Sequence, residues 1–156
     1  MTKLYQANWS WNKNTDSLLN KLCKGRTLNF PCGMSMIGDV RADIDPKVNP
    51  DIVADLLKPY EHFKKLEFNT VLCDPPFSMF NEFKWILKIA DLVQDRFILS
   101  TPPMVIHLSP KRWKKSYFVS EQGNLFLRIF QVFDRANHFL VNPISKVLSV
   151  VEKGEM

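Results

Sequence analysis

The chain has 156 residues, of which 46% are hydrophobic and 24% are charged, and its formal net charge at pH 7 is +5. This length fits a single domain, 1–156, with a sizeable core, and the composition is that of an ordinary soluble globule. No apolar run approaches 18 residues, and the first residues lack the apolar core of a signal peptide. These two observations argue against a membrane protein and predict a cytoplasmic one. The positive charge is compatible with a polyanionic partner such as nucleic acid.

The first part of the chain is expected to hold one helix followed by short strands. Residues 14–25 predict a helix that Asn14 or Thr15 caps and that Gly25 ends. Its apolar face would consist of Leu18, Leu19 and Leu22. The apolar segments that follow predict buried strands at 26–31, 40–44 and 51–55.

The second part of the chain predicts a strand, a helix, a strand and a hairpin. The strands are expected at 69–73 and 96–100, on either side of an amphipathic helix over 79–93. The apolar face of that helix would contain Phe83, Ile86, Leu87 and Ala90. Two further strands, at 116–120 and 125–133, flank a Gly123-Asn124 turn signal, so the sheet would end in an antiparallel hairpin. The whole order is that of an α/β fold with a right-handed strand–helix–strand unit.

Polar residues follow the ends of four predicted strands. In parallel sheets, ligands bind beyond the carboxyl ends of the strands. The segment PCGMS, Asp43 to Asp45, Asp55 and Asp74 all lie at such ends. Four polar strand ends at one edge are hard to explain by packing, and they predict a ligand site there.

These motifs resemble the class I S-adenosylmethionine-dependent methyltransferases, and within them the amino-methyltransferases that act on the N6 amine of adenine in DNA. The resemblance covers residues 14–134 and rests on LNFPCGMS, VRADID, VADL and, most specifically, DPPF. It implies a Rossmann-like, mostly parallel seven-stranded sheet whose last strand is antiparallel, which agrees with the predicted hairpin.

The resemblance also implies that S-adenosylmethionine is the cofactor. Its methionine part would be wrapped by Phe30, Pro31, Cys32 and Gly33. Asp43, followed by Ile44, would accept hydrogen bonds from the ribose hydroxyls, with Asp45 as the alternative. Asp55, with Leu56 beside it, would read the adenine amine.

The chain departs from the family pattern in two respects. It has one glycine where the family often has two or three, and the gaps 31–39 and 45–51 are too short for full crossover helices. We therefore expect a reduced sheet with few helices on one face.

The motif Asp74-Pro75-Pro76-Phe77 has two interpretations. In the simpler one, Asp74 caps a helix that begins at Pro75, which leaves Pro76 and Phe77 without a role. In the other, Asp74 and the Pro75 carbonyl accept hydrogen bonds from a base amine, and the two prolines fix the direction of that carbonyl. Phe77 would then stack on a base that has left its helix.

Other residues are weaker candidates for a site. Trp113 lies among Lys111, Arg112, Lys114 and Lys115, a pattern that fits either a phosphate and stacking patch or a solvated strand entry. Trp9 and Trp11 either line the predicted pocket or pack in the core. The Gly123-Asn124 turn would lie at the same edge as the pocket. The histidines (His62, His107 and His138) and the cysteines (Cys23, Cys32 and Cys73) have no metal-ligand spacing, so we expect reduced thiols and no metal site.

Three functions remain open on the sequence alone. The first is an adenine-specific DNA methyltransferase, and the second is an RNA or other amino-group methyltransferase. The third is a non-catalytic module that binds the cofactor or nucleic acid, against which the intact DPPF motif argues. No segment is long enough for a separate target-recognition domain, so sequence specificity would come from short loops or from a partner in a homodimer, or would be low.

Overall fold

A computed structural model describes residues 11–122 and 126–136. They form a seven-stranded sheet in the order β3-β2-β1-β4-β5-β7-β6. The strands are β1 (Thr27–Asn29), β2 (Val40–Asp43), β3 (Ile52–Val53), β4 (Phe68–Cys73), β5 (Val93–Thr101), β6 (Trp113–Gln122) and β7 (Phe126–Arg135). β7 runs antiparallel to both of its neighbours, and all other pairs are parallel. The predicted fold class, a mostly parallel Rossmann-like sheet with a terminal hairpin, is confirmed.

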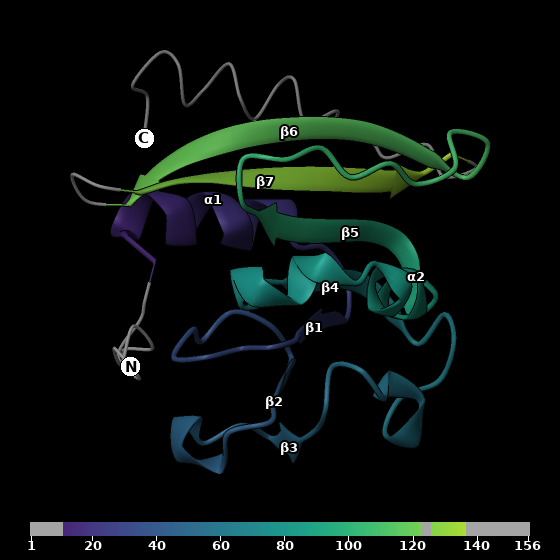
Figure 1. The fold of residues 1–156 in the computed structure, drawn as a ribbon. Coiled ribbons are helices and arrows are strands. Elements are labelled where there is room, and N and C mark those ends of the chain that lie inside the picture. Colours follow the sequence, from purple (N-terminus) through teal and green to yellow (C-terminus); the bar gives the residue numbers. More distant parts are fainter. Residues whose placement is uncertain (1–10, 123–125, 137–156) are drawn as a thin grey trace.

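Helices are few, as the short gaps between the strands predict. α1 (Lys13–Leu22) precedes the sheet, and α2 (Lys84–Ala90) connects β4 to β5. Three short 3-10 segments, η1 (Pro46–Val48), η2 (Pro59–Glu61) and η3 (Phe77–Asn81), complete the connections. The link from β1 to β2 contains no helix. Figure 1 shows the long β6–β7 hairpin at one end of the sheet and the short strands β2 and β3 at the other.

The core lies on both faces of the sheet because side chains alternate along each strand. Leu72, Ile98 and Phe130 pack with the apolar face of α1. Their neighbours along the same strands pack on the opposite face with the buried residues of α2, as Val71 and Phe97 do. Each helix therefore covers one face, and the central strands β4 and β5 are buried from both sides.

The first helix begins earlier than predicted. Its N-cap is Asn12, whose side chain accepts a hydrogen bond from the backbone N–H of Thr15 over 2.8 Å. The prediction that Asn14 or Thr15 caps it is therefore wrong, because both lie inside the helix. Its buried leucines are those predicted, and the helix ends at Leu22, before Gly25.

The predicted helix over 79–93 is divided into two pieces. η3 ends at Asn81, Glu82 has extended backbone angles, and α2 begins only at Lys84. The indole N–H of Trp85 donates to the Met79 carbonyl over 3.0 Å, which ties the two pieces together. α2 buries Trp85, Ile86, Ile89 and Ala90, whereas Phe83 and Leu87 are exposed. The predicted apolar face was thus only half right.

Three features that the sequence singled out lie outside the described residues: Trp9, His138 and the Gly123-Asn124 turn. Within the described ranges, no helix is both long and apolar enough to cross a bilayer.

Candidate active site

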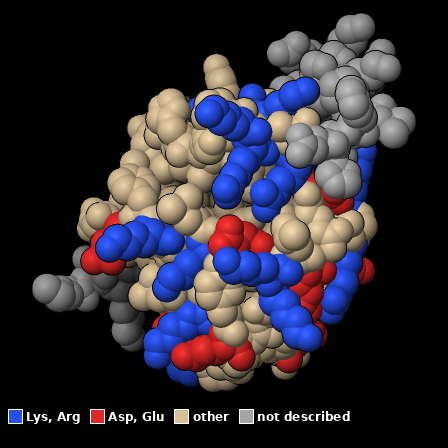
Figure 2. All heavy atoms as spheres, turned by 90° about the vertical axis from the view of Figure 1, so that its right-hand side faces the viewer, with Lys and Arg blue, Asp and Glu red and all other residues tan. Residues whose placement is uncertain are grey.

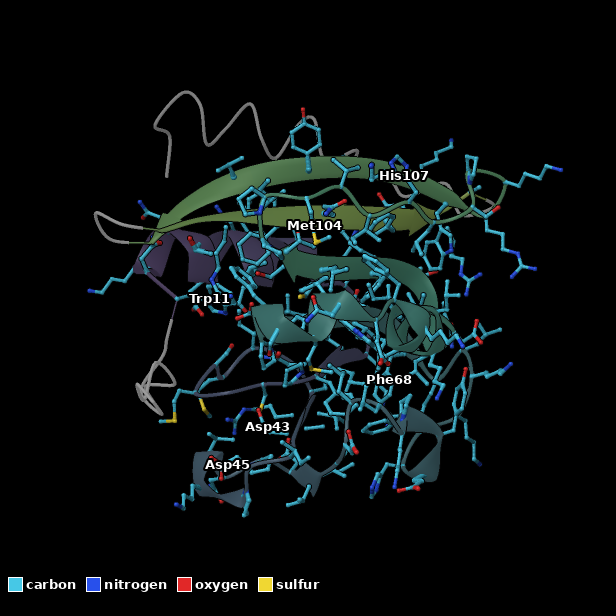
Figure 3. The ribbon with its side chains drawn as sticks, viewed as in Figure 1. Trp11, Asp43, Asp45, Phe68, Met104 and His107 are labelled. Atoms are coloured by element: carbon cyan, nitrogen blue, oxygen red, sulfur yellow. The ribbon has the colours of Figure 1, made fainter. Side chains whose placement is uncertain are left out.

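The carboxyl ends of the parallel strands gather the predicted site residues at one edge of the sheet, which we call the carboxyl edge. It carries the segment 30–33 after β1, Asp43 at the end of β2, Asp55 after β3 and Asp74 after β4. In Figure 3 the carboxyl edge is on the left, where Trp11, Asp43 and Asp45 are labelled. Phe68, at the start of β4, lies toward the right. Because β7 is antiparallel, its first residues also lie at the carboxyl edge.

The loop after β1 is held against the end of β2 by backbone groups. The Cys32 N–H donates to the Ala42 carbonyl over 2.8 Å, and the Gly33 N–H donates to Oδ2 of Asp43 over 2.9 Å. Gly33 has a φ of +50°, which favours glycine. A Cβ built at Gly33 would meet no heavy atom within 4 Å, so the space beside this backbone is open.

The side chains of this loop point mostly into the core. Phe30 is fully buried and lies edge-on to Phe63, with ring centroids 5.7 Å apart. Burial raises the pKa of the Cys32 thiol to about 11, so it is neutral at pH 7. Pro31 and Gly33 are partly exposed. A ligand at this edge therefore reaches the backbone of the loop rather than the ring of Phe30.

The two aspartates proposed for the ribose differ in their surroundings. Asp43 is 8% exposed, and both of its oxygens accept backbone N–H groups: Oδ2 from Gly33, and Oδ1 from Asp45 over 3.0 Å. Asp45 is half-buried, and its Oδ1 accepts the Lys47 N–H over 2.9 Å at the start of η1. Asp43 thus organises the backbone, whereas Asp45 lies closer to solvent. Ile44, between them, is exposed.

Asp55 and Leu56 follow β3 at the same edge. Oδ1 of Asp55 accepts the Leu57 N–H over 2.9 Å, a hydrogen bond to the backbone two residues on that is typical of an Asx-turn. The Asp55 side chain is half-buried, and Leu56 is buried in the core. This turn holds the Asp55 carboxylate at the surface of the carboxyl edge.

Arg41 is a site residue that the sequence analysis missed. Its buried guanidinium donates to the carbonyls of Ser35 over 2.7 Å, Asn49 over 3.2 Å and Gly33 over 3.4 Å. It therefore connects the loop after β1 with the loop after β2. The one signal in the sequence was a charged residue inside a strand that was otherwise predicted to be buried.

Asp74 does not cap a helix. η3 begins at Phe77 with Pro76 as its N-cap and has no side-chain cap, and α2 begins at Lys84 without one. The helix-cap interpretation is therefore wrong. The Asp74 side chain is 12% exposed and forms an ion pair with Arg128 of β7. Pro75 is buried, and Phe77 is exposed at the rim.

Arg128 is the second residue that the sequence analysis missed. Its guanidinium carbon lies 5.0 Å from the ring centroid of Phe77 and 5.3 Å from that of Trp11, and Nη1 lies 3.4 Å from Oγ of Ser100. Trp11 is buried and lies edge-on to Phe130, so it serves both the core and this cluster. The only hint in the sequence was a single charge inside the apolar run LFLRIFQVF.

The basic segment 111–115 lies at the opposite, amino edge of the sheet. Trp113 is 7% exposed, and the guanidinium carbon of Arg135 lies 4.2 Å from its ring centroid, so Trp113 is not available for base stacking. Figure 2 faces this edge and shows acidic side chains among the basic ones. Arg26 and Lys65, for example, pair with Glu67 and Asp91, each over 3.4 Å. The structure therefore favours the solvated strand entry for this segment.

The histidines and cysteines of the described ranges offer no metal site. His62 and His107 are exposed, and no group of three or more His, Cys, Asp or Glu side chains among the described residues could hold a metal ion. Cys73 is fully buried, and burial raises its pKa well above the ordinary value.

Comparison with solved structures shows what this architecture is similar to. An rRNA methylase from Streptococcus thermophilus aligns with a TM-score of 0.55 at 8% identity, over 81% of this chain and 99% of that one. The provisionally named methylase HI0767 from Haemophilus influenzae aligns with a TM-score of 0.52 at 13% identity, over 80% and 89% of the two chains. The provisionally named methyltransferase yhhF from Escherichia coli gives 0.50 at 13% identity, over 83% and 90%.

The fold is that of the class I methyltransferases. No family model and no curated protein matches the sequence. At identities of 8% and 13%, the likeness to the solved structures concerns the fold alone.

Proposed function

We propose that this protein is an S-adenosylmethionine-dependent methyltransferase that acts on an exocyclic base amine in nucleic acid, with adenine N6 in DNA as the first candidate. The observation that carries the proposal is the position of Asp74-Pro75-Pro76-Phe77. This motif follows β4 at the carboxyl edge, in a fold of the methyltransferase class, and Asp74 caps no helix there.

The residues at the carboxyl edge fit the cofactor. Open space beside the positive-φ Gly33 leaves room for a ligand against the backbone. Asp43 and Asp45 lie next to that loop, and their carboxylates offer acceptors for ribose hydroxyls. Asp55 lies after the next strand for an adenine amine. When bound, S-adenosylmethionine supplies a methyl group on a positively charged sulfur. The carboxylates at this edge attract that positive charge.

Asp74 and Pro75 would prepare the target amine. The lone pair of an exocyclic amine is delocalised into the base, so the amine is a weak nucleophile. An Asp74 carboxylate that accepts one hydrogen and a Pro75 carbonyl that accepts the other favour the pyramidal geometry, in which the lone pair is localised. The reaction then depends on positioning more than on proton transfer before attack.

Phe77 would hold the base. Phe77 is 39% exposed and is three residues from Asp74, so a base could stack on its ring while the base amine reaches the carboxylate. Stacking on an aromatic side chain is tolerant of sequence. Specificity would then come from short loops or from a second copy of the chain, and phosphate contacts would make binding sensitive to salt.

RNA is the second candidate substrate. The observation that favours it is the likeness to the rRNA methylase, which extends over 99% of that chain. An RNA loop presents unstacked bases, so a small protein would not have to extrude the base from a duplex.

The decisive test measures transfer from S-adenosylmethionine with a labelled methyl group to separate pools of DNA, RNA and protein. We expect label in DNA or RNA and a product methylated on the base amine. Asp74→Ser should lower transfer by about a hundredfold to a thousandfold, the effect of losing one preorganised hydrogen-bonding group. Asp91→Asn, which removes an exposed ion pair with Lys65 at the amino edge, is the matched control and should keep its activity.

The outcomes separate the candidate functions. Label in RNA but not in DNA would replace the first candidate substrate with the second. Label only in protein, or none with a cofactor that binds, would refute a nucleic-acid methyltransferase. Full activity of Asp74→Ser would show that the carboxylate does not act on the amine.

A further inference from the structure

The guanidinium of Arg128 lies where the proposed function places the amino group of the substrate. It forms an ion pair with Asp74, the proposed acceptor of the amine hydrogens. Its carbon lies 5.0 Å from the ring centroid of Phe77, the proposed stacking platform, and 5.3 Å from that of Trp11. Arg128 thus contacts both residues that the substrate base would use.

A guanidinium resembles an amino-bearing base in the properties that such a site recognises. It is planar, it donates N–H hydrogen bonds within its plane, and its face stacks on aromatic rings. An aminopurine presents the same combination of an N–H donor and a flat π-face. Under the proposed function, the two groups would use the same contacts and would compete for Asp74.

This pair differs from a structural ion pair on the same sheet. Arg96 of β5 pairs with Asp134 of β7 over 2.7 Å near the amino edge, and its side chain is 2% exposed. The Arg96 guanidinium also donates to the Leu22 carbonyl over 2.9 Å, and so fastens α1 to the sheet. The two carboxylates are similarly covered, because Asp134 is 19% and Asp74 12% exposed. The guanidinium groups differ: the Arg128 side chain is 17% exposed and lies 5.0 Å from the ring centroid of the exposed Phe77. A group at the Phe77 ring therefore lies beside the Arg128 guanidinium.

We propose that Arg128 is a substrate mimic that occupies the base site in the free protein and that the amine of the target base displaces it. The displaced guanidinium keeps its charge and lies at the rim, where it binds a phosphate of the same nucleic acid. Arg128 is therefore a specificity-determining residue: it opposes entry of an isolated base and favours a base carried on a phosphate backbone. This inference rests on the proposed function, because it assumes that Asp74 receives a base amine.

The test compares an isolated nucleoside with an oligonucleotide in the wild type and in Arg128→Met. The probes are adenosine, purine riboside (which lacks the amino group) and a short single-stranded DNA that contains adenine. Binding is measured by calorimetry with S-adenosylhomocysteine in excess, so that adenosine cannot enter the cofactor site. The matched control is Arg26→Met, because Arg26 also combines an ion pair, with Glu67, and an aromatic contact, 4.9 Å from the ring centroid of Phe68, but at the amino edge.

We expect Arg128→Met to bind adenosine about tenfold more tightly than the wild type, since no charged hydrogen bond must be broken first. Purine riboside should gain less than adenosine, because it has no amine for Asp74. The oligonucleotide should bind Arg128→Met more weakly than the wild type. The slope of log affinity against log salt concentration should fall by about one, the value for one phosphate contact. Arg26→Met should behave like the wild type with all three probes. Arg128→Lys, which keeps the charge, should retain most of the salt dependence.

An Arg128→Met protein whose affinity for adenosine is unchanged or lower would overturn the inference, as would an equal gain for purine riboside. If Arg128→Met does not fold, Arg128→Leu decides by the same comparison of adenosine with purine riboside, because leucine also removes the charged partner of Asp74. If the wild type transfers methyl groups but Arg128→Met shows no selective gain in adenosine affinity, the role of Arg128 is refuted and the proposed function stands. Absence of transfer to DNA and RNA in every protein would overturn both.

Discussion

The backbone N–H of Gly33 donates a hydrogen bond to the carboxylate of Asp43 over 2.9 Å, and this bond joins the loop after β1 to the end of β2. No helix lies between these two strands, so hydrogen bonds such as this one hold the first loop against the neighbouring strand. The other oxygen of Asp43 accepts the N–H of Asp45 over 3.0 Å. The same carboxylate thus shapes both loops that the cofactor would contact.

This relationship predicts different effects for the two aspartates. Asp43→Ala leaves two backbone N–H groups without their acceptor and should lower the free energy of unfolding by about 1–3 kcal/mol. Asp45→Ala should change stability by less than about 1 kcal/mol, because its hydrogen bond to Lys47 is exposed. If Asp45 carries the ribose, its loss should also remove most of the thermal shift caused by S-adenosylmethionine. Thermal unfolding with and without the cofactor measures both effects, and an unchanged shift in Asp45→Ala would assign the ribose to Asp43.

Gly33→Ala should affect the cofactor more than the fold. Its positive φ makes an alanine unfavourable by about 1–2 kcal/mol, but no atom lies within 4 Å of the new methyl group. That methyl group would project into the space beside the loop, so cofactor affinity should fall. Gly38→Ala is the control. The φ of Gly38 is +104°, and a Cβ there would lie 3.3 Å from the Thr27 carbonyl oxygen, so this variant should be less stable than the wild type. The folded Gly38→Ala protein should bind the cofactor with the affinity of the wild type. Equal cofactor affinity in Gly33→Ala and the wild type would show that the loop does not hold the ligand.

Phe77→Ala should weaken capture of the base, by about 1–3 kcal/mol of lost stacking. Phe77→Tyr and Phe77→Trp should retain activity, since each offers a stacking face. Phe83, which is 49% exposed compared with 39% for Phe77, is the control, and Phe83→Ala should leave the KM for nucleic acid unchanged. A KM that rises equally in both alanine variants would contradict a stacking role for Phe77.

Cys32 predicts a loss of stability at alkaline pH. Its pKa is raised by burial from 9.0 to about 11, so the folded protein holds this proton more tightly than the unfolded chain does. The stabilisation is complete below pH 9 and is lost as the pH rises through 11, at about 1.4 kcal/mol per pH unit. Denaturant unfolding at a series of pH values should therefore show a shallower decline above pH 9 in Cys32→Ala than in the wild type. If the stability of the two proteins changes with pH in parallel, the Cys32 thiol has the same pKa in the folded and the unfolded state.

The basic segment at the amino edge should contribute little to binding at the site. Lys111→Gln with Lys114→Gln removes two exposed charges far along the sheet from Asp74. We expect the affinity of a short oligonucleotide to stay within about twofold, and its salt dependence to keep the same slope. If the slope of log affinity against log salt concentration falls by about two, nucleic acid also contacts this edge.

The sequence by itself determined the positions of most strands, the hairpin and the residues that follow each strand. These features depend on local patterns: apolar runs of strand length and prolines that must end a strand. For this reason the acidic residues at Asp43, Asp55 and Asp74 could be assigned to one edge from the sequence alone. The short connections also revealed that crossover helices would be missing.

Local patterns misjudged two features that depend on particular side-chain contacts. The helix after Phe77 breaks at Glu82, where Trp85 bonds to the Met79 carbonyl. Trp113 was a candidate stacking platform, yet packing and the Arg135 guanidinium cover its ring. In both cases an aromatic side chain found a partner in the folded chain that helical periodicity or a run of basic residues does not reveal.

Only the tertiary structure decided what surrounds Asp74. Arg128 is 54 residues away in sequence, and no spacing rule connects the two. They meet because β7 runs antiparallel between β5 and β6, which returns its first residues to the carboxyl edge beside Ser100. The sequence identified the acceptor from its local motif, but its cationic partner depends on strand order and direction, which long-range pairing sets.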